Sequence, residues 1–132
     1  MSQENVEVVR SLYEAWNSGD YAALRQKVEP EIEVEVALGG NFDGRYQGLA
    51  AAEEPIAEFW TNFGSQHTEI EECVTQGDEV AVGVRLEGRG KHSGAEVEWR
   101  IAHVWTLRRG KIVRWRLFKT MQDALEAAGL SE

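Results

Sequence analysis

The chain has 132 residues, of which 42% are hydrophobic and 28% are charged, and its formal net charge is -9. This length and composition predict one globular domain over residues 1–132 that can fold around its own core. The acidic excess disfavours partners that require basic patches, namely nucleic acids and anionic membrane surfaces.

The first helix is predicted over residues 3–17, where apolar side chains recur at helical spacing. Asn17-Ser18-Gly19-Asp20 ends this helix, and Asp20 can cap a second short helix that Pro30 stops. Residues 31–37 then alternate acidic and apolar side chains, which is typical of a strand with one solvated face and one buried face.

The middle of the chain predicts a loop and a third helix. Residues 38–48 are rich in glycine, and we expect them to form a loop over the mouth of a pocket. Residues 49–63 read as a helix, although Pro55 would remove a hydrogen bond from its interior. The alternative is a helix that begins near Glu54, with Pro55 at its first position.

The second half of the chain predicts antiparallel strands. We expect four of them, at about 67–76, 79–89, 95–108 and 111–119. A short helix over residues 121–128 follows, before Gly129. Helices followed by consecutive strands indicate an α+β fold, with three N-terminal helices packed on a strongly curved, mostly antiparallel sheet and a short C-terminal helix.

No segment has the features of a secretory signal, and no apolar run approaches the roughly 20 residues of a membrane span. The single cysteine, Cys73, cannot form an intrachain disulfide, and we expect it to be a buried apolar filler. These features favour a cytoplasmic location.

Three segments together carry a resemblance to a known family. They are Val9-Arg10-Ser11-Leu12-Tyr13-Glu14-Ala15-Trp16-Asn17-Ser18-Gly19-Asp20, Tyr46-Gln47-Gly48, and Ile112-Val113-Arg114-Trp115-Arg116. With these segments in this order, nearly the whole chain resembles the NTF2-like superfamily, and most closely its SnoaL-like branch of polyketide cyclases and uncharacterised bacterial proteins. The resemblance implies a cone with an apolar cavity, and a homodimer formed through the outer face of the sheet.

The positions that carry catalytic groups in related enzymes are apolar here. The resemblance places the strand acid of ketosteroid isomerases and epoxide hydrolases at Ala102, the isomerase base at Val36 and the isomerase tyrosine at Leu12. None of these side chains can transfer a proton. Isomerase chemistry by that machinery is therefore not expected.

Four polar residues remain as candidates. Arg100 matches the epoxide-hydrolase arginine and could bind an anionic ligand, or it could form a salt bridge with a strand carboxylate such as Glu98. Glu98 shares the strand parity of Arg100 and is a candidate acid or base. Alternation puts His103 on the opposite face from Arg100, so we expect it outside the cavity. If a bulge turned His103 into the cavity, it could act as a general base. Lys119 could bind an anion at the rim or point into solvent.

Carboxylates of the third helix are further candidate acids or bases, namely Glu53, Glu54 and Glu58. The row of Trp99 and Trp105, which includes His103, is expected on the outer face, where it could bury the dimer interface.

Aromatic residues from several elements are expected to line the cavity and to suit a flat, hydrophobic ligand, although core packing explains any single tryptophan equally well. The expected ligand-binding residues are Leu12, Trp16, Val36, Trp60, Phe63, Arg100, Ala102, Trp115, Leu117 and Lys119.

The sequence therefore predicts a SnoaL-like small-molecule pocket protein that binds a hydrophobic or flat ligand, with room for an anionic group. The alternatives are a cofactor-independent cyclase, isomerase or hydrolase acting on a small hydrophobic substrate, and a noncatalytic dimeric accessory domain. No cofactor is expected, and the sequence has no phosphate-binding glycine loop. The nucleophile elbow of serine hydrolases is missing as well. No metal is expected, because the three histidines and Cys73 are not spaced as a ligand set.

Overall fold

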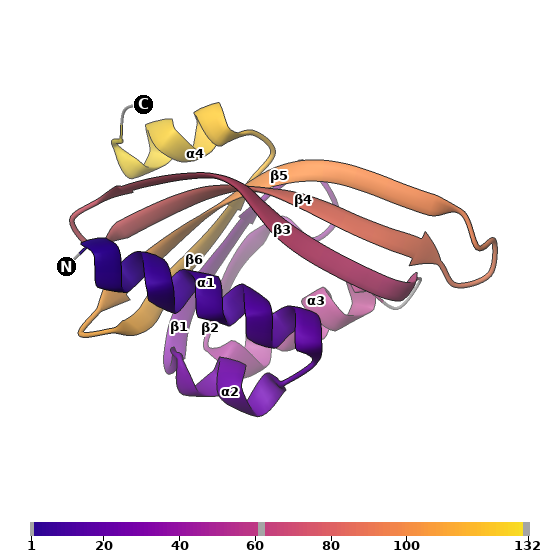
Figure 1. Cartoon of the computed structure of the whole chain (residues 1–132), viewed down its shortest axis with the longest axis horizontal. Coiled ribbons are helices and arrows are strands. Elements are labelled where there is room, and N and C mark those ends of the chain that lie inside the picture. Colours follow the sequence, from indigo (N-terminus) through magenta and orange to yellow (C-terminus); the bar gives the residue numbers. More distant parts are fainter. Residues whose placement is uncertain (1, 61–62, 131–132) are drawn as a thin grey trace.

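A computed structural model describes residues 2–60 and 63–130 and has helices on both sides of a six-stranded sheet (Figure 1). The elements are α1 (Ser2–Ser18), α2 (Tyr21–Gln26), β1 (Val28–Ala37), β2 (Gly44–Gln47), α3 (Leu49–Trp60), β3 (Phe63–Gln76), β4 (Glu79–Gly90), β5 (Glu96–Arg108), β6 (Lys111–Phe118) and α4 (Met121–Ala128). The predicted α+β fold with a strongly curved sheet is confirmed.

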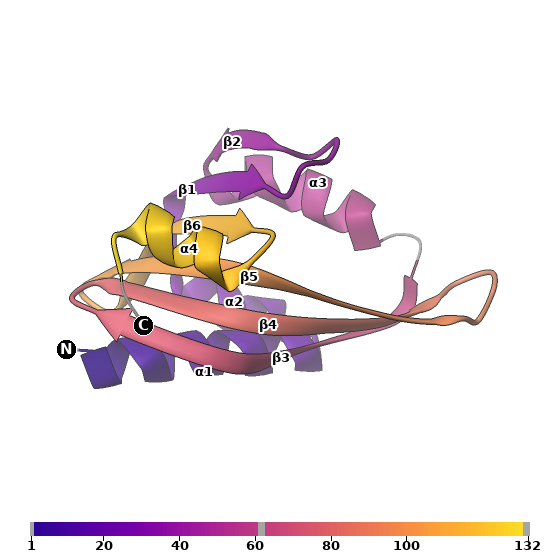
Figure 2. The same cartoon turned by 90° about the horizontal axis from the view of Figure 1, so that it is seen from above.

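The strands lie in the order β2-β1-β6-β5-β4-β3. Every pairing is antiparallel except that of β1 with β6, which is parallel. The sheet bends strongly, with α1 against its inner face and α4 on the opposite face (Figures 1 and 2). The curvature leaves space between the inner face and the helices.

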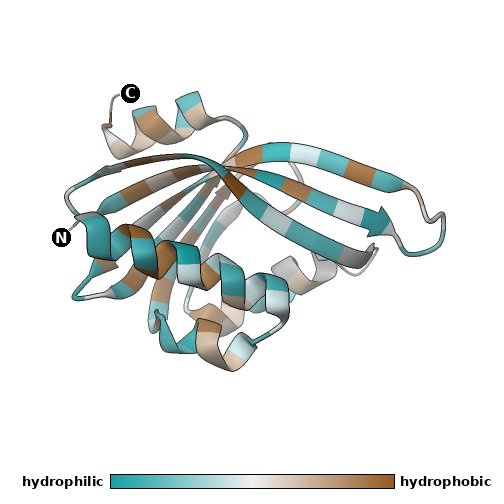
Figure 3. Cartoon of the chain, viewed as in Figure 1, coloured by the Kyte–Doolittle hydropathy of each residue, from teal (hydrophilic) through white to brown (hydrophobic). Residues whose placement is uncertain are grey.

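The main core lies between α1 and the inner face of the sheet. Val9, Leu12 and Tyr13 share one face of α1 and are buried against strand residues such as Val82 and Trp105. Hydrophobic residues concentrate on α1 and on the parts of the strands behind it, whereas the half of β3 on the right of the view is largely hydrophilic (Figure 3). A second, smaller core forms under α4 on the other face of the sheet.

The end of α1 and the start of α2 form as predicted, whereas α2 ends at Gln26, before the Pro30 that was expected to stop it. Gly19 has a φ of 77°, the left-handed conformation that favours glycine after a helix. The Asp20 carboxylate then accepts a hydrogen bond from the backbone N–H of Ala23 at 3.1 Å and caps α2. Asn17 joins the end of α1 to β3 through two hydrogen bonds with the backbone of Thr68, at 2.8 and 2.9 Å.

The predicted start of β1 was wrong. The strand begins at Val28, and Pro30 lies inside it. The register with β6 shifts between Val28 and Glu33, so the residues between them leave the regular ladder. A proline is tolerated there because its missing N–H is not needed for strand pairing.

Three further expectations in this region were wrong, although the third helix does start at Leu49 as first predicted. The segment 38–48, expected to be a loop throughout, contains the short strand β2. The third helix starts at Leu49 and continues past Pro55, so the later start near Glu54 does not occur. The part of this helix predicted to extend to residue 63 instead ends at Trp60.

The four long strands and the last helix lie close to their predicted positions. The turn between β5 and β6 has positive φ at both central residues, 54° at Arg109 and 77° at Gly110. This geometry is that of a tight hairpin turn whose twist matches the flanking strands. Cys73, expected to be buried, is exposed because β3 is the edge strand of the sheet. None of the helices in the described residues has the length and apolarity that a bilayer crossing requires.

Candidate ligand-binding cavity

The inner face of the sheet encloses a cavity of about 380 Å³ together with α1, α3 and the segment before β2. Its wall is mainly aliphatic and aromatic. Leu12 and Trp16 come from α1, Val36 from β1, and Trp115 and Leu117 from β6. Lys119, just beyond β6, also borders the cavity. These six residues belong to the set expected from the sequence.

Arg100, discussed below, also borders the cavity, and the other three residues of that set are not found in its described wall. Phe63 packs against Trp99 with ring centroids 5.7 Å apart and is not part of the cavity wall. The side chain of Trp60 lies outside the described part of the chain. Ala102 was wrongly placed in the cavity: it is fully buried on the other face of the sheet, in the cluster that contains Ala124 and Leu125 of α4.

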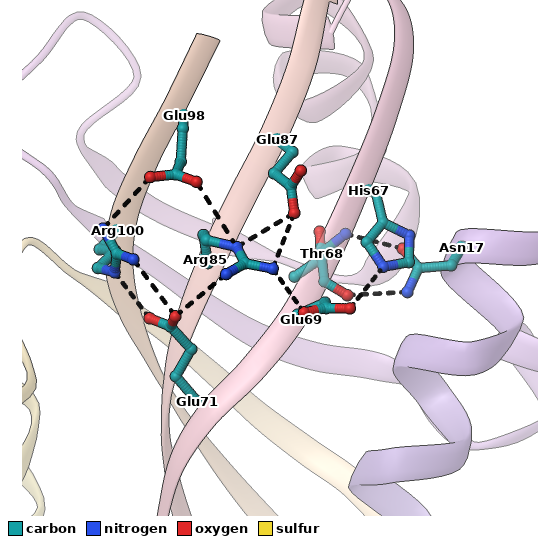
Figure 4. A network of polar contacts seen from close by, with 9 residues as sticks. All are labelled: Asn17, His67, Thr68, Glu69, Glu71, Arg85, Glu87, Glu98 and Arg100. Atoms are coloured by element: carbon teal, nitrogen blue, oxygen red, sulfur yellow. Dashed lines mark hydrogen bonds and ion pairs between the residues drawn. The ribbon is translucent and has the colours of Figure 1, made fainter. Parts of the chain in front are cut away.

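Arg100 borders the cavity, but its guanidinium belongs to the outer face of the sheet. Its Nε donates to Glu71 at 2.8 Å, and its Nη1 donates to Glu98 at 3.4 Å. Figure 4 shows this pair beside Arg85, whose guanidinium contacts Glu69 and Glu87. Of the two alternatives for Arg100, the salt bridge with strand carboxylates is the one observed, and Glu98 is one of these carboxylates and is not in the cavity wall.

The Arg100–Glu71 contact has an electrostatic signature. The hydrogen bond from Arg100, together with the nearby charges of Arg100 and Arg85, holds the pKa of the Glu71 carboxyl below its usual range. The same pairing raises the pKa of Arg100. Both side chains thus remain charged and bound to each other outside the cavity.

His103 lies inside, contrary to the expectation. It is 5% exposed and lines the cavity together with its strand neighbours Ile101 and Trp105. Trp99, in the same row, also lines the cavity. The alternation along β5 was read correctly, but the two faces were exchanged. The row expected at a dimer interface is the row that faces α1.

Tyr13 of α1 is the centre of the polar contacts in this wall. Its hydroxyl lies 2.5 Å from Nδ1 of His103. The indole N–H of Trp105 donates to the same hydroxyl oxygen at 3.0 Å. The Tyr13 and His103 ring planes are within 2° of parallel, with centroids 5.9 Å apart. That separation is too wide for face-to-face stacking and fits two rings joined edge to edge.

Burial sets the protonation of this pair. Desolvation lowers the pKa of His103 to about 3, so its imidazole is neutral at physiological pH. Desolvation also raises the pKa of Tyr13 well above its usual value, although the hydrogen bond from Trp105 acts in the opposite direction. The phenol therefore keeps its hydrogen.

Two tryptophans form a flat aromatic surface beside these groups. Trp105 and Trp115 stack with centroids 4.9 Å apart and planes within 5° of parallel. His103 meets Trp115 edge-on, with ring centroids 5.4 Å apart. Trp16 of α1 meets Trp115 at an angle of 71°. Stacked and edge-to-face aromatic surfaces of this kind complement flat, apolar molecules.

The loop between β1 and β2 lies at the cavity wall near Lys119, and hydrogen bonds to the Asp43 side chain hold it. Desolvation opposes ionisation of Asp43, but hydrogen bonds from the backbone N–H groups of Gly39, Leu38 and Gly40 keep the pKa of its carboxyl below the usual range. Lys119 crosses Gly39 so closely that a Cβ at residue 39 would lie 2.7 Å from the lysine Cε. The loop is therefore held in one conformation where Leu38 and Phe42 line the cavity.

A family model described as a SnoaL-like domain matches residues 9–115. The chain belongs to the SnoaL-like family. A comparison with curated proteins gave no match.

Solved structures share the fold of this SnoaL-like domain. TerC, crystallised with polyporic acid, is 24% identical, with 93% of this chain and 96% of TerC covered and a TM-score of 0.76. A putative SnoaL-like polyketide cyclase from Jannaschia sp. CCS1 is 21% identical, with coverages of 100% and 96% and a TM-score of 0.78. AclR, a putative hydroxylase from Streptomyces galilaeus, is 17% identical, with 98% of each chain covered and a TM-score of 0.77.

The third-helix carboxylates of the SnoaL-like domain do not supply a described acid in the cavity. Glu53 forms a salt bridge with Arg25 of α2 at 3.0 Å, and Glu54 is exposed. The side chain of Glu58 is outside the described part of the chain. Among the described residues, no group of three or more histidine, cysteine, aspartate or glutamate side chains could hold a metal ion.

Tyr13 was assigned no role from the sequence, because the resemblance places the isomerase tyrosine one residue earlier, at Leu12. It belongs to the apolar face of the first helix, so its spacing predicts burial but not a polar role. Its partner His103 is 90 positions away in the chain. A tyrosine on an otherwise apolar helix face was the available signal, because a buried phenol hydroxyl normally has a hydrogen-bond partner.

Proposed function

We propose that this SnoaL-like domain is a pocket protein that binds a flat, apolar small molecule in the cavity between α1 and the inner face of the sheet. The observation that carries the proposal is the aromatic wall built around the stacked pair Trp105 and Trp115. The volume of about 380 Å³ is within the range of roughly 300–1,000 Å³ that is usual for small-molecule sites.

The solved relatives support the same ligand class. TerC was crystallised with polyporic acid, and another relative is described as a putative polyketide cyclase. These proteins share the fold at low sequence identity, so they support a small organic ligand without specifying it.

The side chains of the wall favour binding over acid–base catalysis. Among the described side chains that line the cavity, none is a carboxylate. His103 is a weak base, because burial lowers its pKa to about 3. Arg100 was the main candidate to bind an anionic group of the ligand. Its guanidinium is instead bound to Glu71 outside the cavity.

Homodimer formation through the outer sheet face stays a prediction. The aromatic row expected to bury that interface lies inside, and the outer face around Arg85 and Arg100 carries the ion pairs of Figure 4. An interface there would be polar and sensitive to salt. Sedimentation at micromolar concentration tests it, and a monomer mass would contradict it.

A cavity-filling variant tests the proposed function. Fluorene and fluorenone, two flat tricyclic compounds, should raise the melting temperature of the unmodified protein, because a ligand that binds only the folded state stabilises it. Val36→Phe adds a ring at the cavity wall and should abolish the shift. Val97→Phe makes the same change at a side chain that is 37% exposed and outside the cavity, and should retain the shift. No shift with either compound in the unmodified protein would contradict the proposal.

A further inference from the structure

The hydrogen on the Tyr13 hydroxyl determines which nitrogen of His103 carries a hydrogen. The Tyr13 oxygen already accepts the indole N–H of Trp105. If Nδ1 of His103 also donated to this oxygen, the phenol hydrogen would need another acceptor. Among the described residues, Nδ1 of His103 is the acceptor within hydrogen-bond distance of the phenol.

Leaving a buried hydroxyl hydrogen without an acceptor costs about 1–3 kcal/mol. The favourable arrangement is therefore a chain in which Trp105 donates to Tyr13 and Tyr13 donates to Nδ1. The parallel ring planes fit an in-plane hydrogen bond at Nδ1, and the lack of another acceptor for the phenol among the described residues sets its direction. A neutral imidazole that accepts at Nδ1 carries its hydrogen on Nε2.

Nε2 has no hydrogen-bond partner within residues 2–60 and 63–130, yet it is not one of the polar atoms sealed from solvent. The imidazole is otherwise buried and lines the cavity. The small remaining exposure of Nε2 therefore comes from the cavity, and its N–H is available to a ligand there.

Other polar groups of the wall leave few competing acceptors. The Tyr46 hydroxyl donates to the backbone carbonyl of Phe42 at 2.7 Å. The Trp115 indole nitrogen, a donor only, has no partner in the part of the chain that is described. The hydroxyl of Thr68 can donate or accept, and the Tyr46 oxygen can still accept a hydrogen bond. The Trp115 N–H is sealed from solvent and therefore does not compete with Nε2–H of His103 as a donor to a ligand.

We propose that Nε2–H of His103 is a fixed hydrogen-bond donor that selects flat ligands carrying an oxygen acceptor, such as aromatic ketones and quinones, over the corresponding hydrocarbons. This inference rests on the proposed function and adds the chemical class of the ligand. His103 is the specificity-determining residue, and Tyr13 is a positioning residue that acts through it. The Trp105–Trp115 surface binds the apolar part of the ligand.

A matched pair of ligands tests the selection. Fluorenone and fluorene have the same flat tricyclic frame and differ in a carbonyl against a methylene group. In equilibrium dialysis, fluorenone should bind about 3- to 10-fold more tightly than fluorene, which corresponds to one neutral hydrogen bond. In His103→Leu the ratio of the two affinities should fall to about 1, because neither compound then meets the N–H.

A second measurement needs no variant. Nitrogen NMR of the free, unmodified protein with labelled histidine should find the hydrogen of His103 on Nε2 and a non-protonated Nδ1. In Tyr13→Phe, the Nδ1 acceptor loses its donor, and the two neutral tautomers should become mixed.

The outcomes separate this inference from the proposed function. Equal affinities for the two compounds, a preference that persists in His103→Leu, or a hydrogen on Nδ1 would each overturn the inference while leaving the cavity a binding site. Failure of both compounds to bind would overturn the proposed function, and this inference with it.

Discussion

The hydroxyl of Tyr13 lies 2.5 Å from Nδ1 of His103, so a hydrogen bond joins α1 to β5 across the wall of the cavity. The Tyr13 oxygen also accepts the indole N–H of Trp105. These three side chains are the polar centre of a buried cluster that is otherwise apolar. The stability of the fold and the chemistry of the cavity thus depend on the same contacts.

Tyr13→Phe should lower the free energy of unfolding by about 2–4 kcal/mol, because it leaves the Trp105 N–H and the His103 Nδ1 without a partner. Urea denaturation measures the loss. The control is Tyr21→Phe, which removes the hydroxyl of a tyrosine that is 51% exposed and should change stability by less than about 0.5 kcal/mol. Equal effects of the two variants would show that the buried hydroxyl contributes nothing.

The buried His103 should make the protein less stable in mild acid. The unfolded chain binds a proton at this histidine below a pH of about 6.5, whereas the folded chain does not until about pH 3. The free energy of unfolding therefore falls as pH falls through this window, by up to roughly 1.4 kcal/mol per pH unit from this residue.

A variant isolates the histidine from the carboxylates that titrate in the same range. Between about pH 7 and about pH 5, the unmodified protein should lose roughly 2 kcal/mol more stability than His103→Gln, which cannot titrate. Urea denaturation at the two pH values gives this difference. Parallel losses in the two proteins would mean that His103 is not buried in its neutral form.

Arg100→Ala should raise the pKa of the Glu71 carboxyl, because the hydrogen bond from Arg100 is the main cause of its low value. Carbon NMR of the glutamate side chains during an acid titration measures the change. Arg25→Ala, which removes the salt-bridge partner of Glu53, is the matched control and should leave Glu71 unchanged. An unaltered Glu71 pKa in Arg100→Ala would place the guanidinium away from the outer face.

Ala102→Leu should destabilise the protein by about 1–3 kcal/mol, because the larger side chain has no space under α4. Fluorenone binding by the folded variant should stay as it is in the unmodified protein, because Ala102 lies on the face of the sheet opposite the cavity. Thermal unfolding and equilibrium dialysis measure the two effects. If the folded variant bound fluorenone more weakly than the unmodified protein does, Ala102 would have to lie in the cavity wall.

The helices and long strands could be predicted because their sequence patterns are local. The apolar spacing of the first helix, the Asp20 cap and the Arg109-Gly110 turn each depend on a few neighbouring residues. The short strand β2 and the early start of β1 could not be predicted in the same way. Their pairing depends on distant partners, and Pro30 and four glycines suggest a loop instead.

The main uncertainty for the site was which row of β5 side chains faces the cavity. Both of its rows are largely apolar, because α1 covers one face and α4 covers the other. Alternation alone therefore does not tell which row lines the cavity. Counting back from the Gly110 turn to Ala102 chose the wrong parity, and an error of one residue exchanges every side chain between the two faces. That exchange moved His103 out of the expected site and Arg100 into it.

The most direct test of the account is an NMR titration of the labelled protein with fluorenone. The indole N–H signals of Trp105 and Trp115 and the ring signals of His103 should shift and saturate together, while the guanidinium signals of Arg85 and Arg100 stay in place. Shifts confined to the outer sheet face, or no shifts up to the solubility limit of fluorenone, would contradict the claim that the cavity binds a flat carbonyl compound.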